Sequence, residues 1–198
     1  MGSMMTWYDQ SGNANDATQA TTTAQPKIVD AGALVTGGLD FDGVDDYLST
    51  GLDVAGVHTS FTVSAYKGSN STLVYGRGDA ISRHNLNNTG GTKTTLFSGG
   101  TAAVEDSGDT TVEHISTVFF DGATAANNRI AFNGNTLSST GASSSGTNLL
   151  NSLTIGAELS SITAYGNSLI AELVLYPSDE QSNIDAIRTN INDHYSIY

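Results

Sequence analysis

The sequence contains no cysteine, so neither a disulfide framework nor a thiolate metal site can form. It also has few cations: 7 Lys and Arg stand against 20 Asp and Glu, giving a net charge of -13. Binding to a phosphate backbone requires clustered cations, so we expect no nucleic-acid partner. No apolar run approaches the roughly 18 to 20 residues of a transmembrane helix, so we expect no membrane insertion.

Charged residues make up only 14% of the chain, whereas Thr, Ser, Asn and Gly are abundant. A surface made polar by hydroxyls and amides suits strands and turns, and it equally suits contact with neutral sugars. Composition does not separate these two interpretations. The acidic balance is typical of an extracellular, secreted or virion-surface domain, or of one that takes up divalent cations.

The length of 198 residues fits one large all-β domain better than two small ones. Residues 1–4, MGSM, are interpreted as an expression remnant. The predicted domain organisation is therefore a single domain over residues 5–198.

Short runs rich in β-branched and aromatic residues recur between clusters of Gly, Asn and Asp, which is the pattern of antiparallel strands and turns. Three pairs of runs have the spacing of hairpins: 60–66 with 72–78, 94–100 with 102–108, and 114–122 with 128–135. The run SLIAELVLYP (168–177) is apolar on both faces, which predicts a central strand covered on each side.

One helix is predicted after Pro177. Apolar side chains recur there at helical spacing: Ile184, Ile187, Ile191 and Tyr195. Ser178 and Gln181 have the spacing of a capping box, which predicts a helix start at Ser178. Many strands and one closing helix predict an all-β fold, a two-sheet antiparallel sandwich or jelly roll with a C-terminal α-helix.

Three motifs carry a resemblance to a known family. They are WYDQSGNANDATQ (7–19) followed by QPKIV (25–29), LDFDGVDDYLS (39–49), and the ending from LTIGAE (153–158) through the final helix. Together they resemble the concanavalin A-like lectin/glucanase superfamily in its laminin-G-like branch, of the type found in phage and marine bacterial proteins. The resemblance implies the sandwich fold. It implies no substrate, because such domains serve as sugar-binding modules, adhesion domains and phage appendage parts.

A first acidic loop contains Asp9, Asn13, Asn15 and Asp16. Carboxylate and amide oxygens are the hard ligands that calcium prefers. The resemblance implies a structural calcium between this loop and the last strand, where Glu172 would be the remote ligand. The alternative is a surface turn whose Asp and Asn side chains bind their own backbone.

A second acidic group, Asp42, Asp45 and Asp46, follows a predicted strand. Gly43 permits a tight turn, which would bring Asp42 and Asp46 together. Paired carboxylates are costly without a cation or hydrogen-bond donors. A hairpin turn with exposed acids is the preferred interpretation over a cation site.

A polar strand face is the predicted sugar site. In SFTVSAY (60–66), alternation sends Phe61, Val63 and Ala65 inward and leaves Tyr66 exposed. Exposed aromatic rings near Arg, Asn and His are typical of sugar sites, although an ordinary polar sheet face has the same composition. The predicted ligand-binding residues are Tyr66, Tyr75, Arg77, Arg83, His84 and Asn85.

Catalysis is not predicted. Glucanases of this fold place their carboxylates in an E-x-D-x-x-E run, which this sequence lacks, and no nucleophile elbow accompanies His114 and Ser116. The preferred function is a non-catalytic, lectin-like module that binds a glycan or cell-surface polysaccharide within a larger secreted or virion protein. The alternative is a structural domain of a phage appendage or decoration protein, with other subunits as partners and no small ligand.

Overall fold

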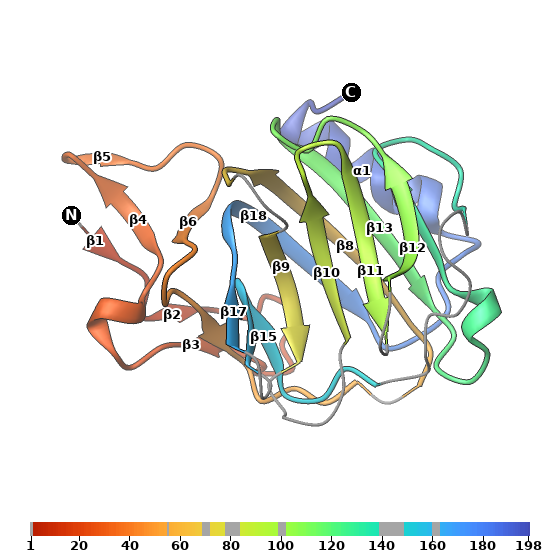
Figure 1. The fold of residues 1–198 in the computed structure, drawn as a ribbon, viewed down its shortest axis with the longest axis horizontal. Helices are drawn as coiled ribbons and strands as arrows, with labels where there is room; N and C mark the ends of the chain where they lie inside the picture. Colours follow the sequence, from red (N-terminus) through yellow and green to blue (C-terminus); the bar gives the residue numbers. More distant parts are fainter. Residues whose placement is uncertain are drawn as a thin grey trace.

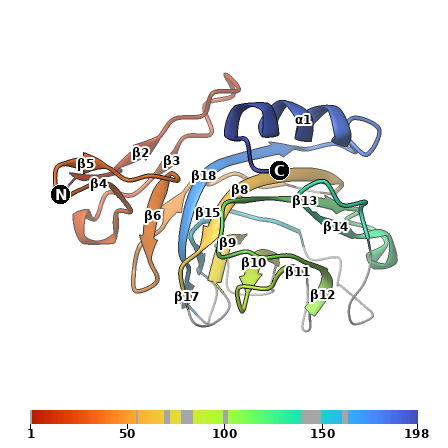
Figure 2. The same ribbon diagram turned by 90° about the horizontal axis from the view of Figure 1, so that it is seen from above.

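The computed structural model describes residues 2–54, 56–68, 72–77, 84–98, 102–138, 149–159 and 163–198. Two antiparallel sheets pack face to face, and one helix lies against the outer face of one of them (Figures 1 and 2). The predicted all-β sandwich with a C-terminal α-helix is confirmed.

The sheet that carries the helix, here the helix-side sheet, has the strand order β1-β4-β6-β18-β8-β13-β14, with β5 paired to β4. Its strands are Gly2–Ser3 (β1), Lys27–Asp30 (β4), Ala33–Leu34 (β5), Leu39–Asp42 (β6), His58–Tyr66 (β8), His114–Phe120 (β13), Arg129–Phe132 (β14) and Asn167–Tyr176 (β18). β18 lies between β6 and β8, so the prediction of a central strand at 168–177 is confirmed.

The second sheet has the order β12-β11-β10-β9-β15-β7-β3-β2. Its strands are Thr6–Trp7 (β2), Ala17–Thr18 (β3), Leu48–Ser49 (β7), Thr72–Arg77 (β9), His84–Thr89 (β10), Lys93–Ser98 (β11), Ala102–Ser107 (β12) and Leu153–Ile155 (β15). Ala157–Leu159 (β16) and Thr163–Tyr165 (β17) form a separate two-stranded sheet.

Two of the three predicted hairpins are confirmed, because β11 pairs with β12 and β13 pairs with β14. The hairpin of 60–66 with 72–78 is wrong. β18 and β13 occupy both edges of β8, so no edge is free for β9. The chain instead crosses to the second sheet after Tyr66.

Residues 2 and 3, within the predicted expression remnant, form β1 and pair with β4. Backbone groups alone make this ladder, so it requires no particular side chains. Trp7, the single tryptophan, is half-buried and packs against the main core between the sheets.

A second core lies under the helix α1, Ile184–Tyr195. Ile184 and Ile191 are buried against Phe61 and Val63 of β8, and Ile187 packs beside them. Figure 2 shows α1 lying along the outer face of this sheet. None of the helices in the described ranges combines the length and apolar character needed to cross a bilayer.

The predicted helix start at Ser178 is wrong, because α1 begins at Ile184. Thr59 of β8 holds the preceding segment on the sheet instead. Its hydroxyl donates to the Ser178 carbonyl at 3.0 Å and accepts the Glu180 N–H at 3.0 Å. These bonds keep residues 178–180 out of helical geometry.

Candidate functional site

β8 is buried on both faces, which overturns the predicted sugar face. Phe61 and Val63 pack under α1, whereas Ser60 and Ser64 point into the space between the sheets. Tyr66 is only 8% exposed. The alternation was predicted correctly, but the polar side faces the second sheet and not solvent. The prediction that Tyr66 is solvent-exposed is therefore wrong.

The other described members of the predicted set are also buried. Tyr75 is 0% exposed, and its hydroxyl lies 2.9 Å from the Ser60 hydroxyl. Burial raises the pKa of Tyr75 to about 12. Arg77 is 4% exposed. Neither side chain can stack on an external sugar, because both are buried.

Arg83 lies outside the described residues. The backbone of His84 and Asn85 belongs to β10, and their side chains lie outside the description. The described part of the predicted set therefore forms no open platform.

Polar side chains fill the space between β8, β10 and β13. Asn88 donates to the Ser64 hydroxyl at 3.3 Å, and its carbonyl oxygen lies 3.1 Å from His114 Nε2. The hydroxyls of Thr94 and Ser116 lie 2.9 Å apart. Burial lowers the pKa of His114 to about 4, so its ring is neutral at neutral pH. These groups hydrogen-bond to one another, which marks them as internal structure.

The first acidic loop forms a turn with internal hydrogen bonds. The Asp9 carboxylate accepts the N–H groups of Asn15 at 3.0 Å and Ser11 at 2.8 Å, and the Ser11 hydroxyl at 2.8 Å. Asp16 accepts the Asp9 N–H at 2.8 Å, and Asn13 donates its amide to Ser11. The backbone N–H of Asn15 is the main cause that lowers the pKa of Asp9 to about 2. This geometry favours the turn interpretation, and calcium here stays a prediction.

Glu172 lies on β18 beneath α1. It lines an open recess of about 320 Å³ with Asn190, Ile191, His194 and Tyr195. Burial raises the pKa of Glu172, and the nearby His194 opposes that rise. None of the described side chains that line this recess comes from the 9–16 loop.

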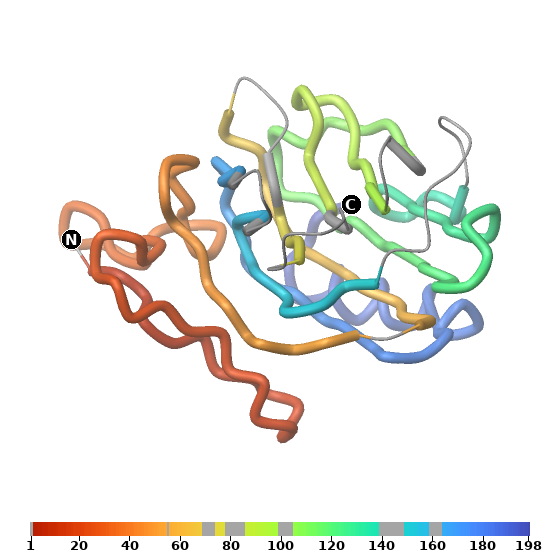
Figure 3. The backbone as a smooth tube through the Cα atoms, turned by 60° about the horizontal axis from the view of Figure 1, so that its bottom comes forward, coloured from red at the N-terminus to blue at the C-terminus, as the bar shows by residue number. Residues whose placement is uncertain are grey.

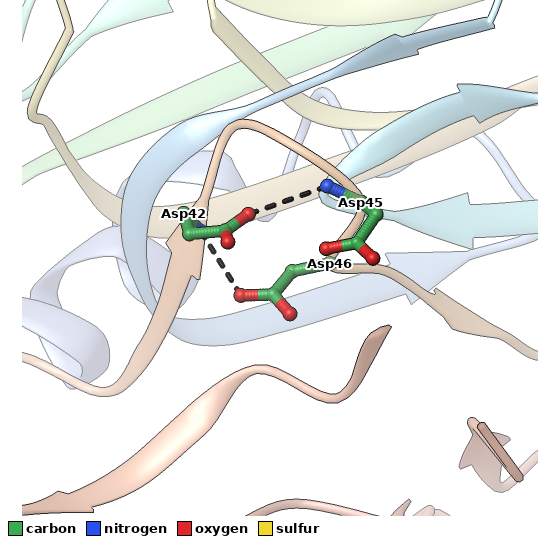
Figure 4. Close-up of side chains that lie close together, drawn as sticks. All are labelled: Asp42, Asp45 and Asp46. Carbon is green, nitrogen blue, oxygen red and sulfur yellow. Dashed lines mark hydrogen bonds between the residues drawn. The ribbon is translucent and has the colours of Figure 1, made fainter. Parts of the chain in front are cut away.

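The second acidic group forms a compact turn between β6 and β7 (Figure 4). Carboxylate oxygens of Asp42, Asp45 and Asp46 lie within 4.8 Å of one another. Asp46 accepts the Asp42 N–H at 3.0 Å, and Asp42 accepts the Val44 N–H at 2.8 Å. Gly43 has a φ of +78°, so the predicted glycine turn that brings Asp42 and Asp46 together is confirmed.

The three acids differ in exposure. Asp42 is exposed, as predicted, but Asp46 is only 3% exposed because it turns inward to accept the Asp42 N–H. Burial, with the nearby charge of Asp42, raises the pKa of Asp46 to about 6. The turn thus concentrates negative charge without a cationic partner inside the cluster.

Two tyrosines lie beside this turn. The rings of Tyr47 and Tyr165 have centroids 6.4 Å apart at a 37° tilt, and both are half-buried. Gly43 approaches Asn167 so closely that an added Cβ would stand 2.8 Å from the Asn167 Cβ. Among the described residues, neither tyrosine hydroxyl, nor the Asp45 carboxylate, nor the Asn167 amide has a hydrogen-bond partner.

These groups form the candidate site, which we call the edge site. Its residues are Asp42, Asp45, Asp46, Tyr47, Tyr165 and Asn167. The FDGVDDY motif indicated the acids and contains Tyr47. Tyr165 and Asn167 were missed, because no local sequence pattern reports that β17 and the start of β18 pack against this turn.

Neither a family model nor a curated protein matches the chain. Solved structures do. A Trypanosoma rangeli sialidase in complex with sialic acid has a TM-score of 0.67 at 14% identity, over 97% of this chain and 32% of the sialidase. The chain thus spans about a third of the length of that enzyme.

Two further structures are similar. The CBM40 of Ruminococcus gnavus IT-sialidase, bound to α2,3-sialyllactose, has a TM-score of 0.51 at 13% identity, over 77% of this chain and 97% of that one. A structure of botulinum neurotoxin type C has a TM-score of 0.55 at 9% identity, over 96% of this chain and 51% of the toxin chain. Cell entry of that toxin is described as dependent on interaction with two ganglioside molecules. Likeness at these identities establishes the fold alone: the chain is a two-sheet antiparallel β-sandwich.

Proposed function

We propose that this chain is a non-catalytic, lectin-like module and that a glycan binds at the edge site. The pair of Tyr47 and Tyr165 carries the proposal, because aromatic faces suit contact with sugar C–H groups. Asp45 lies in the turn that leads into Tyr47, and Asn167 follows Tyr165 by two residues. Their side chains have no hydrogen-bond partner among the described residues and can bond sugar hydroxyls. The similar structures hold sialic acid and sialyllactose, which supports glycan binding for this fold.

Binding without hydrolysis follows from the placement of the acids. Most glycosidases use two carboxyl groups that reach the scissile bond, one of them with a raised pKa. Asp46 has the raised pKa, but it is buried and accepts the Asp42 N–H. With only 3% of its surface exposed, Asp46 is poorly placed to protonate the glycosidic oxygen of a bound sugar.

Calcium is part of the proposal, at the acidic turn. Three carboxylates within 4.8 Å offer hard oxygen ligands, and a cation would relieve the repulsion around Asp46. The Asp9 loop is the weaker candidate, because the Asp9 oxygens already accept backbone N–H groups. The ion would order the turn against β18.

The wider setting is also proposed: a laminin-G-like module of a larger secreted or virion protein. One observation favours the alternative, an assembly domain. The N-terminal arm (residues 2–34) carries exposed apolar side chains, including Met5, Tyr8 and Leu34. Figure 3 shows its β2–β3 hairpin projecting from the sandwich. Such a surface suits contact with other subunits.

A glycan array with the intact protein tests the proposal, followed by affinity measurements on its best ligand. Tyr165→Ala and Tyr47→Ala should weaken binding by about 1 to 3 kcal/mol, the range for lost aromatic stacking. Tyr8→Ala removes an exposed tyrosine outside the site and is the matched control. Melting curves verify that each variant folds. A stable oligomer that binds no glycan would favour the assembly domain instead.

A further inference from the structure

A nearby cation favours the binding of an anionic glycan. A sugar carboxylate such as that of sialic acid is bound most strongly by charge-assisted hydrogen bonds, above all from the arginine fork. The chain has 7 Lys and Arg in total. Whether each described Lys or Arg side chain is paired or free therefore affects whether the edge site can bind an anionic glycan.

Lys67, which lies beside the edge site, is already paired. The backbone N–H of Lys67 donates to the Asn167 carbonyl at 3.0 Å, which places Lys67 beside the site. Its ammonium group, however, forms an ion pair with Asp40. Lys27 lies directly opposite the same Asp40 in the β4–β6 ladder.

The other described cations are engaged elsewhere. Lys93 Nζ lies 2.7 Å from both carboxylate oxygens of Glu105. Arg188 pairs with Asp185 at 2.6 Å. Arg129 donates to two backbone carbonyls near its own position, and Arg77 is buried. Within the described ranges, therefore, every arginine is bonded or buried, Lys93 is paired with Glu105, and Lys27 and Lys67 both stand beside Asp40.

The edge site itself is negative. Asp42, Asp45 and Asp46 stand within one turn, where three ionised carboxylates carry a charge of -3, and a calcium ion bound by all three would still leave a charge of -1. A whole-chain net charge of -13 adds to the same potential. An incoming carboxylate would meet like charges at short range, whereas sugar hydroxyls would meet acceptors.

We propose that the glycan bound at the edge site is uncharged, a neutral hexose-type chain that carries no sialic acid. The inference rests on the proposed glycan-binding function. It separates this chain from the similar structures, which hold sialic acid and sialyllactose. The same sandwich fold would then hold an uncharged glycan in this chain and a sialylated one in those structures.

An array of matched glycan pairs, each printed with and without its terminal sialic acid, tests the inference on the intact protein. It is run in calcium and again in chelator. The neutral member of each bound pair should bind at least tenfold more tightly. Preference for the sialylated members would overturn the inference while leaving glycan binding intact. A preference for the sialylated members that appeared only in calcium would also overturn the inference. No binding to any glycan would overturn the proposed function itself.

A charge variant provides the second arm. Asp42→Asn with Asp45→Asn removes two negative charges with little change of shape, so discrimination against the sialylated members should shrink several-fold. Asp193→Asn on the exposed side of α1 removes one negative charge away from the site and should leave the discrimination unchanged. Unchanged discrimination in the double variant would overturn the charge argument. Loss of sialylated binding in Arg83→Gln would overturn it too, by identifying Arg83 as a cation that serves the site.

Discussion

The hydroxyls of Ser60 on β8 and Tyr75 on β9 lie 2.9 Å apart in the space between the two sheets. The two strands, expected to lie side by side in a hairpin, face each other across the sandwich instead. A phenol with no exposed surface needs a polar partner, and Ser60 provides it. The Ser/Thr face of β8 is therefore interior. Tyr66 and Tyr75, which the sequence predicted to lie on a sugar-binding face, are buried in the sandwich.

Tyr75→Phe should destabilise the protein by roughly 1 to 2 kcal/mol, because it leaves the Ser60 hydroxyl buried without its partner. Urea denaturation measures the change. Adding Ser60→Ala should recover part of the loss, since the double variant leaves no orphan hydroxyl. A double variant whose losses simply add would show that the two hydroxyls are not coupled.

Tyr66→Ala should lower the free energy of unfolding by about 2 to 4 kcal/mol. The ring is buried under the turn between β10 and β11, where an added Cβ on Gly91 would stand 3.6 Å from it. Thermal melting by circular dichroism measures the loss. Tyr8→Ala, at an exposed tyrosine, should change stability by no more than about 0.5 kcal/mol. Equal effects of the two variants would contradict the burial of Tyr66.

Acid should destabilise the protein through His114. Its pKa is about 4 in the folded chain, mainly because the ring is buried, against 6.5 when unfolded. The unfolded state therefore binds the proton first. Stability from this group is full above pH 6.5 and is lost as the pH falls toward 4, by about 3 kcal/mol in total. Unfolding measured at several pH values should show this slope, and His114→Gln should flatten it. A variant with an undiminished slope would assign the acid sensitivity to other groups.

Asp46 should contribute a pH dependence of the opposite sign. Its folded pKa of about 6 lies above the unfolded value of 3.8. Stability from this group is full below pH 3.8 and is lost as the pH rises through 6. Asp46→Asn keeps an oxygen acceptor for the Asp42 N–H and removes the charge. It should therefore raise the stability at pH 7 and have little effect at pH 4. A loss of stability at pH 7 would show that the charge is needed there.

Calcium should stabilise the protein through the acidic turn. A ligand at a hundredfold excess over its dissociation constant adds about 2.7 kcal/mol of stability. Melting curves in calcium and in chelator measure the gain, which Asp46→Asn should reduce and Asp9→Ala should preserve. A gain lost only in Asp9→Ala would move the ion to the 9–16 loop. Identical curves in calcium and chelator would retire both cation sites.

The strands and the closing helix were predictable because alternation and helical spacing are local signals. The burial of both faces of β8 was not predictable in this way. Phe61 and Val63 look like a core face, and they are one, but that core is the one under α1. Ser60 and Ser64 look like a solvent face, yet a second sheet covers them. Alternation marks two faces of a strand and cannot reveal that both are covered.

The edge site was predictable only in part. Gly43 between two acids indicated a tight turn that brings Asp42 and Asp46 together, and the structure has it. The burial of Asp46 and the approach of Tyr165 depend on segments distant in the sequence. Tertiary packing sets those features, so no window of sequence contains them.

The central position of β18 has a consequence for the nascent chain. β6 and β8 both pair with β18, which is the last of the described strands to be translated. Until residues 167–176 leave the ribosome, β1, β4 and β6 cannot join β8, β13 and β14 in one sheet, because β18 pairs between the two groups. At roughly 5 to 20 residues per second, β6 and β8 wait several seconds or more with unpaired edges. The polar Ser/Thr face of β8 keeps that waiting strand less prone to self-association than an apolar strand would be.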